Sequence, residues 1–150
     1  MRNKVVRIAI RGLTAAALAL SVACGANLAL AAMSSVQKAI YDSYASAAKT
    51  ADAAFTEFSA SRGQALFQGK HAGGKADTAS CTACHTTDPK KIGRTRAGKE
   101  IQPMAASANP KRFTDAADVE KWFRRNCLDV LGRECTTLEK GDVLAYLLGI

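Results

Sequence analysis

Two cysteines and a histidine lie close together in the run Cys81-Thr82-Ala83-Cys84-His85. Two thiols three positions apart on a helical turn meet the two vinyl groups of a porphyrin, and the imidazole that follows reaches the iron from one face. A dithiol redox centre would leave His85 unexplained, and a zinc site needs four ligands. The motif therefore predicts one covalent haem c, attached through Cys81 and Cys84, with His85 as an iron ligand.

The N-terminal segment has the pattern of an export signal. Basic residues precede an apolar run rich in alanine and leucine, which ends in the small residues Ala29-Leu30-Ala31. This pattern predicts a signal peptide over residues 1–31, cleaved near Ala31, and a periplasmic monohaem domain over residues 32–150. An uncleaved membrane anchor and a lipidated Cys24 remain open as alternatives. The basic residues are Arg2, Lys4, Arg7 and Arg11.

Two further cysteines lie near the C-terminus. An exported chain meets an oxidising compartment, where thiols are used in covalent bonds. Cys127 and Cys135 are separated by seven residues, which is a poor match to the second half of a zinc knuckle. With Cys81 and Cys84 assigned to the haem, these two are expected to form one disulfide.

Composition and periodicity together predict the fold class. The 150 residues are 48% hydrophobic and 23% charged, which is the usage of one globular domain. Aromatic residues make up only 6%, so the core gains from closing around a buried apolar cofactor. Apolar residues recur at helical spacing and no segment is a convincing strand, so we predict an all-α domain. Helices are expected from Ser34 or Ser35, from about Glu57 to Gln68, from Thr114 to about Cys127 and from Thr137 to Leu148, with residues 86–112 as a proline-bearing loop over the haem.

Several segments resemble a known family. Gly63-x-x-Leu66-Phe67 ahead of the haem motif and a terminal helix with Tyr146 look like the two crossing helices of class I cytochromes c. More specifically, the chain from Arg62 onward is similar to the sphaeroides haem protein family of c-type cytochromes. The matching segments are Arg62-Gly63-Gln64-Ala65-Leu66-Phe67, Gly73-Gly74-Lys75, Ser80-Cys81-Thr82-Ala83-Cys84-His85, Thr95-Arg96-Ala97-Gly98-Lys99-Glu100-Ile101, Arg112-Phe113-Thr114-Asp115, Val119-Glu120-Lys121-Trp122, Arg125-Asn126-Cys127, Gly132-Arg133-Glu134-Cys135-Thr136 and Glu139-Lys140.

This resemblance implies a class I cytochrome c-like fold with an unusual sixth ligand. In that family an asparagine oxygen, directly before the first disulfide cysteine, binds the iron opposite the histidine, and the matching residue here is Asn126. Val119 and Phe123 place Asn126 on an inward helical stripe, although periodicity alone favours a buried capping or hydrogen-bonding amide over a ligand. A neutral amide oxygen is a weak, hard donor that suits Fe(III) better than Fe(II). Reduction is therefore expected to release it and to open the ferrous site to O₂, NO or CO.

A conventional sixth ligand is also present in the sequence. Pro103-Met104 looks like the pair that supplies a thioether ligand in electron-carrying cytochromes c, so Met104 remains the alternative to Asn126. His71, in a glycine-rich stretch, is expected to be solvated.

We expect a periplasmic electron carrier that also binds gas, rather than an enzyme. Because no second titratable group is placed for proton-coupled chemistry, an oxidase, an NO-consuming enzyme or a gas sensor would rely on the iron alone. The resemblance points to a dihaem cytochrome c as electron partner, with a membrane b-type cytochrome upstream. The basic run Lys90, Lys91, Arg94, Arg96 and Lys99 is either a solvated face or a rim that steers an acidic redox partner. Nucleic acid is excluded as a partner, since the charge is modest and no readout motif is present.

Overall fold

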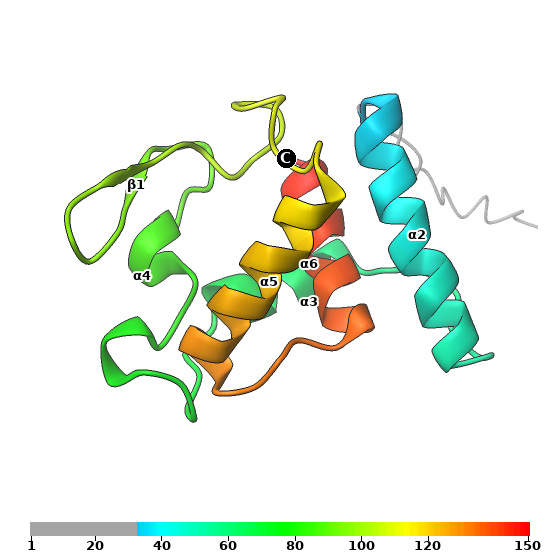
Figure 1. Cartoon of the computed structure of the whole chain (residues 1–150), viewed down its shortest axis with the longest axis horizontal. Helices are drawn as coiled ribbons and strands as arrows, with labels where there is room; N and C mark the ends of the chain where they lie inside the picture. The colour runs from blue at the N-terminus through cyan, green and yellow to red at the C-terminus, as the bar shows by residue number, and fades with distance from the viewer. Residues whose placement is uncertain (1–32) are drawn as a thin grey trace, which may run out of the picture.

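The computed structural model describes residues 33–150, so the predicted signal peptide and its cleavage site near Ala31 lie outside the described residues. The helices are α2 (Ser35–Ala51), α3 (Ala60–Gln68), α4 (Thr82–His85), α5 (Ala116–Leu131) and α6 (Thr137–Leu148), with a 3₁₀ turn η1 (Ala76–Thr78) and two short strands, β1 (Gly93–Arg94) and β2 (Glu100–Ile101) (Figure 1). The predicted all-α class is confirmed. Within residues 33–150 the structure contains no helix with the length and apolarity needed to cross a membrane.

Helix α2 begins where the sequence predicts, but its buried face is shifted. The hydroxyl of Ser34 accepts a hydrogen bond from the backbone N–H of Gln37 (3.2 Å), which caps the helix. Ile40 and Tyr44 are buried, whereas Val36 is 49% exposed and Gln37 is buried instead. The amide of Gln37 donates to two backbone carbonyls of the loop before α5 (2.8 and 3.3 Å). A polar residue faces inward here because that loop presents unpaired acceptors.

The structure corrects two predictions about secondary structure. The loop over residues 86–112 contains a short antiparallel hairpin, in which Gly93 pairs with Ile101 and Arg94 with Glu100. Two residues per strand are too few to produce a period-2 pattern in the sequence. Helix α5 also runs one turn past the predicted end at Cys127, because its terminator is Gly132 in the left-handed region (φ 70°).

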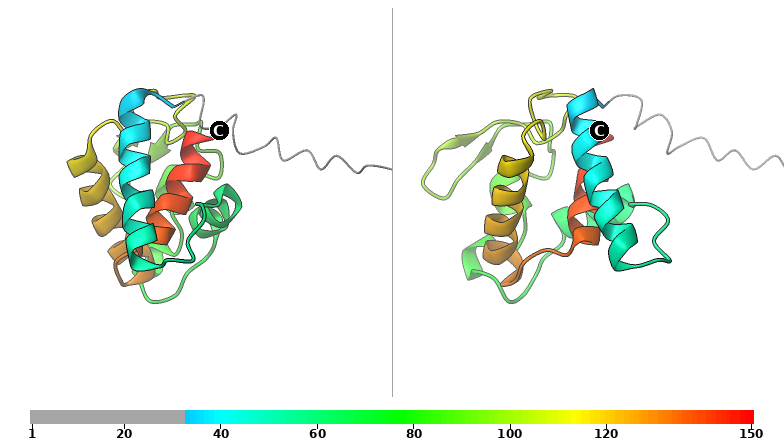
Figure 2. Two further views of the ribbon diagram at one scale, coloured as in Figure 1. Left: turned by 90° about the vertical axis from the view of Figure 1, so that its right-hand side faces the viewer. Right: turned by 45° about the vertical axis from the view of Figure 1, so that its right-hand side comes forward.

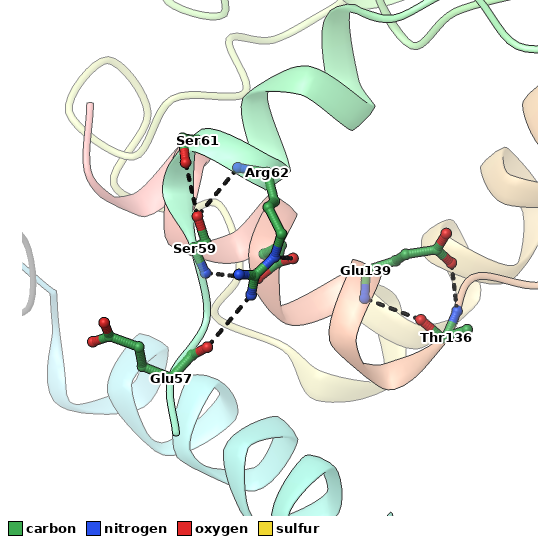
Figure 3. Close-up of polar contacts among 7 residues, drawn as sticks. Glu57, Ser59, Ser61, Arg62, Thr136 and Glu139 are labelled. Atoms are coloured by element: carbon green, nitrogen blue, oxygen red, sulfur yellow. Dashed lines mark hydrogen bonds and ion pairs between the residues drawn. The ribbon is translucent and has the colours of Figure 1, made fainter. Parts of the chain in front are cut away.

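The crossing of α3 over α6 organises the centre of the molecule. A Cβ atom at Gly63 would overlap the backbone carbonyl of Asp142, so only glycine allows this approach. The buried carboxylate of Asp142 accepts hydrogen bonds from the backbone N–H of Ser59 (2.6 Å) and from Nε of Arg62 (2.7 Å). Figure 3 shows Ser59 and Arg62 converging at the start of α3. Phe67 and Tyr146 pack at the same crossing, with ring centroids 5.9 Å apart, and this confirms the predicted pairing of the two helices.

Two apolar clusters lie on opposite sides of this crossing. The cluster under α2 includes Ile40, Tyr44 and Val119, and the second cluster consists of Phe67, Val143, Tyr146 and Leu147. Helix α2 lies on one side of α6, while α4 and the hairpin lie on the other (Figures 1 and 2). The second cluster therefore faces the segment that carries the cysteine–histidine motif.

The Gly63→Ala variant is expected to be less stable than the wild type by about 2 to 3 kcal/mol, since its new methyl group would force α3 and α6 apart. Gln64→Ala, at an exposed position of the same helix, is the control and should be near neutral. The free energy of unfolding in guanidinium chloride measures both. Equal stability of the two variants would show that the crossing has room for a side chain.

Candidate functional site

The cysteine–histidine motif forms one helical turn. Cys81 is the N-cap residue of α4 and His85 is its last residue. The backbone N–H of His85 donates to the carbonyl of Cys81 (3.0 Å), which closes the turn. Thr86 then takes a left-handed conformation (φ 63°) that ends the helix directly after the histidine. The motif thus has the local geometry that its spacing predicts.

Both cysteines of the motif are free thiols and both are half-buried. Burial raises the pKa of the Cys81 thiol to about 11, so this group is a protonated thiol at neutral pH. Cys127 and Cys135 are instead joined by a disulfide, with their Cα atoms 5.6 Å apart. The structure therefore leaves the CxxC pair available for thioether bonds.

The imidazole of His85 lacks a hydrogen-bond partner. Its Nδ1 atom is buried and unpaired, the one buried side-chain polar atom within residues 33–150 with this property. Burial, with a contribution from the charge of Arg112, lowers the pKa of His85 to about 4. A neutral imidazole is the form that binds a metal. An orphaned buried nitrogen costs free energy unless another group completes its environment. A neutral imidazole without protein partners would be available to bind a haem iron through one of its ring nitrogens.

The surroundings of α4 are apolar and incompletely covered. Cys81, Met104, Phe113 and Phe123 are partly buried side chains that pack against the second apolar cluster. Strand β1 closes on α4 at Gly93, where a Cβ atom would overlap the carbonyl of Cys84. Within the described part of the chain, no group of three or more His, Cys, Asp or Glu side chains can hold a bare metal ion. These residues fit a large apolar ring attached to the two thiols.

Asn126 lies on a different element from the motif. It is half-buried on α5, one residue before the disulfide cysteine Cys127, and its side chain makes no hydrogen bond to any residue of 33–150. Val119 is buried and Phe123 half-buried on the same stripe of the helix. Within residues 33–150 the half-buried amide of Asn126 therefore has no hydrogen-bonding partner.

Met104 also borders the site. Its side chain contacts the same apolar cluster as Cys81, and its backbone N–H donates to the carbonyl of Pro89 (2.8 Å). His71 has a different role, because its Nε2 atom hydrogen-bonds the carbonyl of Leu66 (2.8 Å). Met104 therefore lies beside the site, and His71 is hydrogen-bonded within the turn that follows α3.

Arg112 and Phe113 border the site without a predicted role. The half-buried guanidinium of Arg112 donates to the carbonyls of Pro103 (2.9 Å) and Gln102 (2.6 Å), which fixes the loop around Met104. Phe113 takes a left-handed conformation (φ 60°) as it turns toward the apolar cluster. Both lie in the segment Arg112-Phe113-Thr114-Asp115, which is one of the segments that resemble the family. No local sequence pattern predicts what either residue does.

This chain is similar in sequence to known proteins. A protein-family model described as a domain of unknown function (DUF1924) matches residues 53–147. The chain is 59% identical over 88 residues to cytochrome c-type protein SHP of Cereibacter sphaeroides, a match that covers 59% of this chain and 68% of that protein. It is 37% identical over 121 residues to cytochrome c'' of Methylophilus methylotrophus, covering 80% of this chain and 83% of the relative.

Solved structures agree with the sequence matches. Oxidized SHP, described as an oxygen binding cytochrome c, superposes with a TM-score of 0.68 at 49% identity, covering 77% of this chain and 96% of that one. Oxidized cytochrome c'' from Methylophilus methylotrophus gives 0.63 at 33% identity, covering 75% and 93%. The solution structure of that cytochrome, described as giving insights into haem-ligand detachment, gives 0.63 at 36% identity, covering 75% and 91%.

Fold and site together define a class I-type, monohaem cytochrome c. The chain belongs to the sphaeroides haem protein family of c-type cytochromes, and its cofactor is one covalently bound haem c.

The predicted attachment through Cys81 and Cys84 is tested by intact-mass analysis after periplasmic expression. The expected mass is that of the chain from about Ala32 plus one haem, less two hydrogens for the disulfide. Replacing both cysteines by alanine should abolish covalent haem. Cys127→Ser should retain it and lower the free energy of unfolding by about 2 to 3 kcal/mol, because only a short loop closure is lost. Retention of covalent haem in the double variant would rule out the assignment.

Proposed function

We propose that this protein is a periplasmic electron carrier whose reduced form binds a diatomic gas, with His85 and Asn126 as the residues that would bind the haem iron. The observation that carries the proposal is the unpaired half-buried amide of Asn126 on α5, in a chain that also presents an unpaired buried imidazole at His85. The 49% identity to a structure described as an oxygen binding cytochrome c supports the gas ligand.

The residues of α4 hold the cofactor. Cys81 and Cys84 would form thioethers with the haem, and the neutral imidazole of His85 would bind its iron. When bound, the haem supplies the electron that is transferred and the iron at which a gas can bind. Phe67, whose ring centroid lies 6.1 Å from that of His85, limits the rotation of the imidazole.

Asn126 acts as a weak, redox-sensitive ligand in this proposal. Its amide oxygen would bind Fe(III) more strongly than Fe(II), because a hard neutral donor has less affinity for the softer Fe(II). In the reduced protein the N–H₂ group of Asn126 would be available to donate a hydrogen bond to O₂ or NO. The relative whose solution structure is described in terms of haem-ligand detachment supports a ligand that leaves.

The proposed electron partners are a dihaem cytochrome c and, upstream, a membrane b-type cytochrome. Of the basic run after the motif, Arg94 pairs with Glu100 (3.4 Å) and Arg96 pairs with Asp77. Lys90, Lys91 and Lys99 are exposed and form no ion pair with other residues of 33–150. These three lysines support a rim that attracts an acidic partner, since unpaired exposed charges act at long range.

A conventional His/Met electron carrier is the second candidate. The side chain of Met104 packs on the same cluster as Cys81, so the thioether is close to the cofactor. Methionine would stay bound in both oxidation states and would leave no open position for a gas.

Two alanine variants separate these candidates. Asn126→Ala should remove the ferric oxygen ligand and leave the ferrous spectrum nearly unchanged, because the ligand has already left in the reduced protein. Met104→Ala should leave both spectra nearly unchanged. Absorption spectra of the two oxidation states, with CO added to the reduced protein, measure this, and wild-type ferrous protein should be high-spin and bind CO rapidly.

The opposite result would reassign the protein. A low-spin ferrous form that resists CO, and that is lost only in Met104→Ala, would establish the His/Met carrier and remove the ligand role of Asn126.

A further inference from the structure

Helix α5 is fixed firmly at its C-terminal end. The disulfide joins Cys127 to Cys135, and the carbonyl of Asp129 accepts hydrogen bonds from the backbone N–H of Lys75 (2.7 Å) and the hydroxyl of Thr78 (3.0 Å). Covalent and backbone contacts therefore hold the helix directly beyond Asn126. Its N-terminal half packs through Val119 on the cluster under α2 and also makes polar contacts.

A polar cluster of three side chains connects the N-terminal half of α5 to its neighbours. The hydroxyl of Tyr44 on α2 donates to Oε1 of Glu120 on α5 (2.5 Å), and Nζ of Lys140 on α6 donates to Oε2 of the same carboxylate (2.7 Å). Tyr44 is buried, and the Lys140 side chain is only 14% exposed. Burial and the nearby Glu120 raise the pKa of Tyr44, so its hydroxyl remains a donor. We name these three residues the α5 clamp.

The clamp bridges a region that apolar packing does not fill. A hollow of about 220 Å³ lies among α2, α5 and α6, and Ser43, Ala47, Ala116 and Thr137 are among its lining residues. Small side chains on all three helices leave this space. Beside it, the ring of Tyr44 meets that of Phe123 edge-on (centroids 6.3 Å apart). The hydrogen bonds through Glu120 therefore add to the apolar packing of Val119 in setting how α5 sits against α2.

Glu120, Phe123 and Asn126 follow one another along the same helix. Glu120 and Asn126 are separated by about 9 Å along the axis, at 1.5 Å per residue. A helix transmits a tilt over that distance as a nearly rigid rod. Because Asn126 lies next to the fixed C-terminal end, a tilt of α5 displaces its backbone little but turns the direction in which the amide points.

We propose that the α5 clamp positions Asn126, with Tyr44 as the positioning residue whose hydroxyl holds α5 where the amide can act as a ligand. This inference rests on the proposed ligand role of Asn126. Helix α2 precedes residues 53–147, the part of the chain that the family model matches. A helix outside that core thus adjusts how easily the ligand is displaced.

The test is Tyr44→Phe, which removes one hydroxyl and keeps the ring against Phe123. Tyr41→Phe is the matched control, because Tyr41 lies on the same helix and packs on Phe58 (5.3 Å), while its hydroxyl makes no hydrogen bond to any residue of 33–150. Added imidazole competes with Asn126 for ferric protein. Its affinity should rise about threefold or more in Tyr44→Phe and stay unchanged in Tyr41→Phe.

Hydrogen exchange gives a readout that does not depend on ligation. Amides of residues 116–126 should lose protection in Tyr44→Phe, while those of α3 keep theirs. Lys140→Met, which removes the second donor to Glu120, should act in the same direction. Unchanged exchange in α5 together with unchanged imidazole affinity would overturn the clamp.

The Asn126→Ala background separates the two proposals. If the clamp acts through the ligand, Tyr44→Phe should no longer change imidazole affinity when Asn126 is absent. A persisting change would overturn the positioning role. A ferric spectrum that Asn126→Ala leaves unaltered would instead refute the ligand role itself, and hydrogen exchange would then still report whether Tyr44 restrains α5.

Discussion

The close crossing of α3 and α6 is the contact on which the rest of the structure depends. Gly63 lets the two backbones approach, and the buried carboxylate of Asp142 then fixes their register by binding Ser59 and Arg62 at the start of α3. An ionised group buried without partners would be unfavourable, so the crossing is specific as well as close. It divides the apolar core into two clusters. One cluster supports α2 and the other faces the cofactor segment.

The cofactor site combines a local part and an assembled part. Cys81, Cys84 and His85 lie within one turn, so their mutual geometry needs almost no tertiary structure. Met104 packs on the same cluster as Cys81 from the long loop, and Asn126 lies on α5, so the positions of both depend on the whole fold. This division suits the proposed chemistry, in which the covalent attachment is permanent and a sixth ligand that is released on reduction would be held on a separate element.

The same division explains what the sequence could predict. The haem motif, the cap at Ser34 and the crossing helices depend on short-range patterns, and they appear in the structure as the sequence indicates. Gln37 replaces Val36 on the buried face because of carbonyls 73 and 75 residues away, which no local pattern encodes. No local pattern encodes the approach of Gly93 to Cys84 or the position of Arg112 near His85 either. The resemblance indicates Asn126, while the structure contributes its lack of a hydrogen-bonding partner.

A weak ligand needs a rigid support more than a strong one does. The bond from an amide oxygen to iron contributes little by itself, so occupancy of the position depends on how well the protein presents the amide there. At one end of α5 the disulfide and the carbonyl of Asp129 supply that support, and at the other end the hydrogen bonds of Glu120 supply it. Of these, only the contacts at Glu120 are made by flexible side chains around a hollow. If Asn126 is the ligand, small sequence changes in α2 would therefore tune how easily it is displaced without altering the cofactor's attachment.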